Sequence, residues 1–132
     1  EGDYEDYKLK VRAILNAVGN YVYNHLKSNK ILITPPQGGF YLMPEFKSKK
    51  FNCSSQLCET ILNETGVAML PGSDFGFHPK KMLTRLSYTD FDGIEFFRKI
   101  SDYKSISEEM VKKYAPNVVE GTTKLSNWAK NL

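Results

Sequence analysis

The sequence predicts an α+β fold, a mixed α/β class in which a small β-sheet packs against a long N-terminal helix and two or three further helices. Three patterns predict it: a long amphipathic segment, several short apolar segments bounded by proline or glycine, and further helical patterns between and after them. With 132 residues the chain can build one hydrophobic core, and it is too short for two ordinary domains. We therefore expect a single domain over residues 1–132.

The first element is a helix over residues 7–28. Its apolar residues recur at intervals of three and four, which places them on one stripe of an amphipathic helix. They are Val11, Ile14, Leu15, Val18, Val22 and Leu26. Ser28 and Asn29 are expected to end this helix.

Two short strands are expected next. Residues 31–34 predict a strand that stops at Pro35 and Pro36, and residues 40–43 predict a second strand after a turn at residues 37–39. Because proline cannot donate a hydrogen bond to a neighbouring strand, Pro44 indicates that the second strand ends there or lies at an edge.

A second helix is expected from Ser54 or Ser55, either of which can cap it, to a stop at Gly66. Its apolar stripe comprises Leu57, Cys58, Ile61 and Leu62. Residues 67–70 then predict a short strand, and residues 71–76 are too rich in glycine and turn-forming residues to continue it.

The last part of the chain predicts one more strand and more helices. Residues 83–89 alternate as a strand does, and Thr89 or Asp90 is expected to open a helix. Ser105 and Glu108 have the spacing of a capping box before a further helix that ends near Pro116. The apolar residues of the first of these helices are Phe91, Ile94, Phe97 and Ile100.

Composition argues against several partners. The 18 basic and 15 acidic side chains give a net charge of only +3, so we expect neither nucleic acid nor an acidic membrane as a partner. The longest apolar runs are four residues, far below the ~20 that cross a bilayer. No sorting segment is visible, and a cytoplasmic location is therefore expected.

Arg85 is the residue most suggestive of function, because the alternation of residues 83–88 places its guanidinium in the middle of a strand. A planar fork of N–H donors can bind a carboxylate through two hydrogen bonds, which suits an acidic small molecule. Two structural alternatives remain open: an edge-strand arginine that points into water, and an arginine paired with an internal carboxylate.

Other candidates are weaker. The loop at residues 71–76 could present N–H groups to an anion, but its spacing matches no phosphate motif and favours a simple connection. The spacing of Cys53 and Cys58 does not indicate a metal site, and Cys58 is expected to be a small buried apolar residue. An RNA-binding surface around Phe40 and Tyr41 is a further alternative, although Pro44 interrupts that strand.

Three segments taken together carry a family resemblance: PQGGFYL at residues 36–42, GVAMLPGSDFG at residues 66–76 and TRLSY at residues 84–88. In this order they resemble the C-terminal part of class I/II pyridoxal-phosphate aminotransferases, of the fold-type-I aspartate aminotransferase superfamily. The resemblance implies that residues 1–132 form the small C-terminal domain of such an enzyme. The large cofactor-binding domain is expected to lie outside this chain.

The resemblance also implies an activity and a site. Arg85 would bind the substrate α-carboxylate, and Phe75 would be a packing residue. The full-length enzyme would use pyridoxal 5'-phosphate, exchange an amino group between an amino acid and a 2-oxo acid, and form a homodimer. The chain alone is expected to be inactive, to bind no cofactor and to contain no catalytic, cofactor-binding or metal-binding residue. A stand-alone domain that binds amino or 2-oxo acids without catalysis is the alternative.

Overall fold

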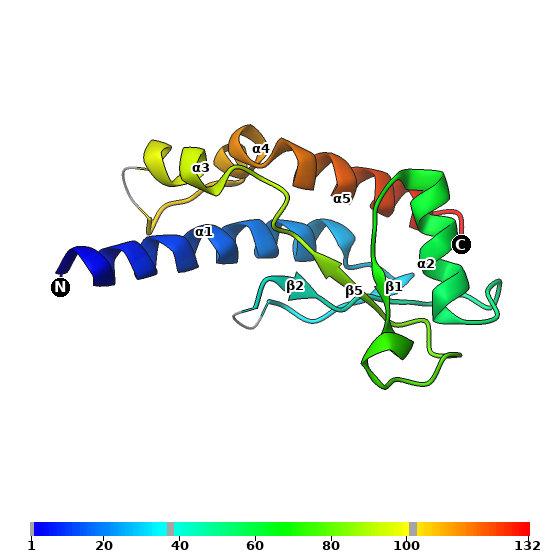
Figure 1. Cartoon of the computed structure of the whole chain (residues 1–132). Coiled ribbons are helices and arrows are strands. Elements are labelled where there is room, and N and C mark those ends of the chain that lie inside the picture. The colour runs from blue at the N-terminus through cyan, green and yellow to red at the C-terminus, as the bar shows by residue number, and fades with distance from the viewer. Residues whose placement is uncertain (1, 37–38, 101–102) are drawn as a thin grey trace.

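A computed structural model describes residues 2–36, 39–100 and 103–132 and confirms the α+β class (Figure 1). The long helix α1 (Gly2–Leu26) runs between a row of helices and the short strands, as Figure 1 shows; the row consists of α3 (Gly93–Lys99), α4 (Glu108–Tyr114) and α5 (Pro116–Ala129). Contacts of α1 with α3, α4, α5 and β2 hold the two sides together. The main core therefore forms around this one helix.

The stripe predicted for α1 is confirmed, since Ile14, Val18, Val22 and Leu26 are buried. The helix begins earlier than the predicted residue 7 and ends at Leu26 instead of Ser28. Glu5 and Asp6 lie near the start of this helix, where the helix dipole favours negative charge. At the other end, the Ser28 hydroxyl accepts hydrogen bonds from two following backbone N–H groups and so forms a turn.

The strands are shorter than predicted and belong to two antiparallel sheets. One sheet has two strands, and the other has three strands in the order β2-β5-β4. A bridge between Glu45 and Leu83 links the two sheets. The strands are β1 (Ile31–Leu32), β2 (Tyr41–Leu42), β3 (Glu45–Phe46), β4 (Leu70–Pro71) and β5 (Thr84–Ser87).

Strand β3 was not predicted. Pro44 interrupts the ladder after β2, as expected, but the chain pairs again at once with a different partner, β1. The carbonyl of Pro44 still bonds to the neighbouring strand, because it accepts hydrogen bonds from both the backbone N–H and the hydroxyl of Thr84. The turn predicted at residues 37–39 lies partly outside the described residues.

Helix α2 (Ser54–Thr65) has the predicted C-terminal stop, Gly66, at a φ of 81°. The predicted cap is wrong: Cys53 occupies the N-cap position, and Ser54 is buried with its N–H donating to Pro79 O at 2.7 Å. Leu62 is exposed, contrary to the predicted stripe, whereas Leu57, Cys58 and Ile61 are buried. The buried face is thus narrower than the apolar pattern indicated.

Helix α3 (Gly93–Lys99) begins later than the predicted Thr89 or Asp90. Asp92 caps it, and its Oδ1 accepts a hydrogen bond from Glu95 N at 3.0 Å. The inward face also differs from the prediction, because Phe96 is buried while Ile94 is 67% exposed. Ile100, just beyond the helix, is buried as expected.

Two helices complete the fold. Ser107, not the predicted Ser105, caps α4 (Glu108–Tyr114) by accepting a hydrogen bond from Met110 N. Helix α5 (Pro116–Ala129) was not predicted as an element and packs against α1 and α2. The described chain thus has four α-helices after α1, whereas two or three were expected. Within the described ranges, none of the helices combines the length and apolar character that a membrane span requires.

Candidate functional site

Arg85 lies on the outer face of the three-stranded sheet. Strand β5 alternates, so that Thr84 and Leu86 are buried in the core while Arg85 is half-buried and Ser87 exposed. The strand is central in its sheet, with β2 on one side and β4 on the other (Figure 1). Arg85 is therefore not an edge-strand arginine.

Buried hydrogen bonds fix the position of β5. Thr84 is 0% exposed, and its N–H and hydroxyl donate to Pro44 O at 2.9 and 2.8 Å. One residue after the strand, the buried Tyr88 donates its hydroxyl to Gly39 O at 2.6 Å. Burial raises the pKa of the Tyr88 hydroxyl, which keeps it protonated and able to donate. These bonds hold the backbone on both sides of Arg85.

Two aromatic rings contact the Arg85 guanidinium. The guanidinium carbon Cζ lies 3.9 Å from the centroid of the Tyr41 ring and 4.8 Å from that of the Phe75 ring. Both distances are within the ~6 Å range of cation–π interactions. Phe75, expected to be only a packing residue, therefore borders the candidate site.

Across the residues that the structure describes, Arg85 forms neither an ion pair nor a side-chain hydrogen bond. The alternative of an arginine paired with an internal carboxylate is thus wrong within these ranges. Arg85 also lines neither the apolar groove between α1 and α3 nor the cavity beside α5. Arg85 is half-buried, and its guanidinium contacts two aromatic rings and no carboxylate of the described residues.

The loop at residues 71–76 is a connection that positions Phe75. After β4 it forms a short 3₁₀ helix, η1 (Gly72–Phe75), which Gly76 ends at a φ of 90°. Gly72 N donates to Leu83 O at 2.7 Å, and the N–H groups of Gly76 and Phe77 donate to carbonyls within the loop. Because internal bonds use these N–H groups, they are not arranged as an anion cradle.

The lysines of the described ranges do not fit pyridoxal phosphate, because none of them is buried. A lysine that binds this cofactor covalently needs an amine that burial or a nearby cation holds neutral. Lys50 and Lys124 border shallow cavities near α5, but both are exposed. Lys50 Nζ donates to Asn131 O, and Lys124 pairs with Glu120 at 3.0 Å.

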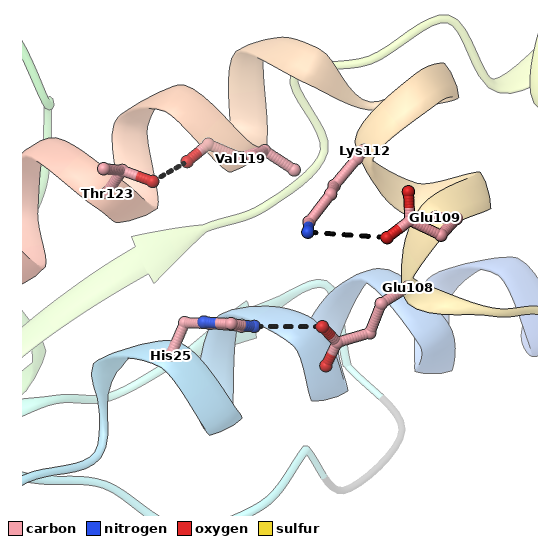
Figure 2. Close-up of polar contacts among 6 residues, drawn as sticks. All are labelled: His25, Glu108, Glu109, Lys112, Val119 and Thr123. Atoms are coloured by element: carbon pink, nitrogen blue, oxygen red, sulfur yellow. Dashed lines mark hydrogen bonds and ion pairs between the residues drawn. The ribbon is translucent and has the colours of Figure 1, made fainter.

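The remaining candidates have structural roles. Cys58 is buried, and burial together with nearby Asp74 raises its pKa to about 11, which leaves the thiol protonated. His25 points from α1 to Glu108 at the start of α4, with Nε2 and Oε1 3.2 Å apart, as Figure 2 shows. No cluster of metal-ligating side chains occurs among the described residues. The RNA-binding alternative needs a long aromatic strand, but β2 has only two residues, Tyr41 and Leu42. The Tyr41 ring contacts Arg85.

Sequence reasoning found Arg85 but missed Tyr41 as its neighbour. The register pairs Tyr41 with Ser87 and Leu70 with Arg85, so Tyr41 lies diagonally across from Arg85 on the same face. Alternation gives the face of each residue within a strand, but it does not give the register between strands that are more than forty residues apart. No signal in this sequence alone could have supplied that pairing.

Comparison with known proteins identifies a family and two relatives. The family described as aminotransferase class I and II matches residues 3–99, which is more than half of the chain. An inactive alanine aminotransferase of Saccharomyces cerevisiae is 28% identical over 120 residues, covering 83% of this chain and 23% of that protein. A probable N-acetyl-LL-diaminopimelate aminotransferase of Bacillus subtilis is 36% identical over 70 residues, covering 52% of this chain and 17% of that protein.

The chain thus spans less than a quarter of the length of these curated relatives. The match includes β5 and therefore Arg85, as well as η1 and β2, which carry the two rings beside it. The family match, together with the α+β architecture, establishes that this chain belongs to the class I and II aminotransferase family.

Proposed function

We propose that this chain is the C-terminal small domain of a pyridoxal-phosphate-dependent aminotransferase. In this proposal Arg85 binds the α-carboxylate shared by the amino acid and 2-oxo acid substrates. The observation that carries the proposal is the Arg85 guanidinium, which lies without an acidic partner among the described residues on the outer face of a central strand.

The geometry suits carboxylate binding. A guanidinium presents two parallel N–H donors that match the two oxygens of a carboxylate. Because Thr84 and Tyr88 fix the strand on both sides, the guanidinium is attached to a rigid base. Gripping the carboxylate fixes the orientation of the reacting carbon and so reduces the entropy lost in the reaction.

The cofactor would belong to the rest of the protein, because the lysines described here do not fit it. The small share of each relative that the chain covers supports this division. A substrate held by Arg85 on one side and by the remainder of the enzyme on the other would favour a closed state that excludes water. The small domain would then both bind and enclose the substrate.

The experiment is a transamination assay of the full-length protein that contains this chain, with a panel of amino acids and 2-oxo acids. Arg85→Lys replaces a bidentate contact with a single one and should lower kcat/KM by roughly 2–4 kcal/mol. The control is Arg98→Lys, on the exposed side of α3, which should leave kcat/KM unchanged. If Arg85→Lys and the wild type have the same kcat/KM, Arg85 does not bind the substrate.

A second candidate is a domain that binds amino or 2-oxo acids without catalysis. It is favoured by the relative from Saccharomyces cerevisiae whose name describes an inactive enzyme, and carboxylate binding by Arg85 needs no cofactor. Calorimetry of 2-oxo acid binding separates the two candidates. Binding that Arg85→Lys abolishes, in a full-length protein without turnover, supports this second function.

A further inference from the structure

We infer that Tyr41 and Phe75 are positioning residues that hold the Arg85 guanidinium in the orientation in which its N–H edge is open to a carboxylate. The inference deepens the proposed function and rests on it. It assigns a role to two exposed aromatic side chains, and it identifies what replaces the acidic partner that a half-buried arginine usually has.

The two rings reach Arg85 from opposite sides of its strand. Tyr41 lies on β2, which is one neighbour of β5, and Phe75 ends η1, which directly follows the other neighbour, β4. The Arg85 Cζ atom is 3.9 Å from the Tyr41 centroid and 4.8 Å from the Phe75 centroid. Arg85 is therefore flanked by aromatic rings along the hydrogen-bonding direction of the sheet.

This contact restricts the guanidinium without using its hydrogen-bond donors. A ring attracts the guanidinium through its negatively polarised face, whereas the five N–H groups lie in the guanidinium plane and remain available. A carboxylate partner within the chain would instead occupy these donors. Aromatic contacts thus order the side chain in advance, which reduces the conformational entropy lost when a substrate binds.

The exposure of the rings argues against a role in core packing alone. Tyr41 is 40% exposed and Phe75 is 39% exposed, and among the described residues neither ring packs against another aromatic ring. Phe77 has nearly the same exposure, 41%, in the segment that follows η1, but it makes no cation–π contact with Arg85. Phe77 is therefore a matched control for the loss of an exposed ring.

The kinetic test uses the full-length protein with a transaminated substrate. Tyr41→Leu and Phe75→Leu should each raise KM by about 3- to 10-fold, the size of one cation–π contact, with kcat close to the wild-type value. Tyr41→Phe and Phe75→Tyr keep a ring and should retain the wild-type KM. Phe77→Leu should change neither constant.

An Arg85→Met background tests whether the rings act through Arg85. Without the guanidinium, Phe75→Leu should have no further effect on KM, because the residue has nothing left to orient. A Phe75→Leu effect of the same size in both backgrounds would overturn the inference and assign the ring a direct contact with substrate. Leucine variants with a wild-type KM would overturn it as well.

A spectroscopic readout separates this inference from the proposed function. Arg85 is one of three arginines in this 132-residue chain, and its NMR signal is the one that Arg85→Lys removes; Arg12 and Arg98 lie over no ring among the described residues. Ring currents should shift the Arg85 Nε–Hε NMR signal upfield of the other two, and Phe75→Leu should move it back toward them. If Arg85→Lys weakens substrate binding but this signal is not shifted, the inference fails alone. If Arg85→Lys has no effect, the proposed function fails first.

Discussion

Gly19, in the middle of α1, packs too closely against Tyr88 to leave room for a side chain. A Cβ atom there would lie 2.9 Å from Cζ of Tyr88 and 3.0 Å from Cγ of Pro36. Tyr88 cannot swing away freely, because its ring is buried and its hydroxyl is bonded to Gly39 O at 2.6 Å. Gly19→Ala is therefore expected to destabilise the protein, although alanine normally favours a helix.

The magnitude follows from three contributions. Alanine gains about 1 kcal/mol of helix propensity over glycine. Overpacking against the Tyr88 ring costs about 1–3 kcal/mol, and a weakened Tyr88 hydrogen bond costs about 1 kcal/mol more. The expected net loss is about 1–3 kcal/mol in the free energy of unfolding. For a chain of this size, each lost kcal/mol lowers Tm by about 3–5 °C.

Urea and thermal unfolding of the variant measure this loss, and Gly121→Ala is the matched control. Gly121 also lies inside a helix, α5, but a Cβ atom there meets only Val67 Cγ2 at an ordinary 3.7 Å. Gly121→Ala should therefore stabilise the protein by up to about 1 kcal/mol. If both substitutions raise the stability equally, the close packing of α1 against Tyr88 is refuted.

Three other predictions concern the core, a thiol and the cofactor. Thr84→Val removes the buried hydroxyl that bonds Pro44 O and should cost about 1–3 kcal/mol in urea unfolding; an unchanged midpoint would contradict this. Cys58, whose pKa burial raises from about 9 to about 11, should react with iodoacetamide at pH 8 about 100-fold slower in the folded than in the urea-unfolded protein, as mass spectrometry can measure. Because the folded-state pKa is raised, the stability that the protonated Cys58 contributes is present below pH 9 and is lost as the pH rises towards 11. Pyridoxal phosphate followed by borohydride should modify no single lysine of this chain stoichiometrically, and one uniquely modified lysine would contradict the expectation.

Local patterns in the sequence predicted the elements that are governed by local physics. The stripe of α1, the stop of α2 at Gly66 and the alternation around Arg85 each depend on residues within a few positions of one another. They are confirmed for this reason. The placement of Arg85 on a face outside the core follows from the same alternation.

The structure differs from the predictions where contacts between residues far apart in the sequence determine the conformation. Several residues near each helix start can cap it, so the sequence does not decide between Asp90 and Asp92 or between Ser105 and Ser107; the structure has Asp92 and Ser107 as the caps. Strand β3 forms by pairing with β1, in which Phe46 lies opposite Ile31. These two residues are separated in the sequence by strand β2, so local patterns do not reveal the pairing. The aromatic neighbours of Arg85 belong to this second group, since Tyr41 meets Arg85 through the register of β2 with β5 and Phe75 through the path of η1 after β4.

The most direct test of the account compares two substrates in the full-length protein: an amino acid and the amine that lacks only its α-carboxylate. The wild type should prefer the carboxylate by about 30- to 1,000-fold in kcat/KM, the equivalent of roughly 2–4 kcal/mol. Arg85→Lys should lose most of this preference, whereas Arg98→Lys should keep it. An undiminished preference in Arg85→Lys would contradict the central claim that this guanidinium binds the substrate carboxylate.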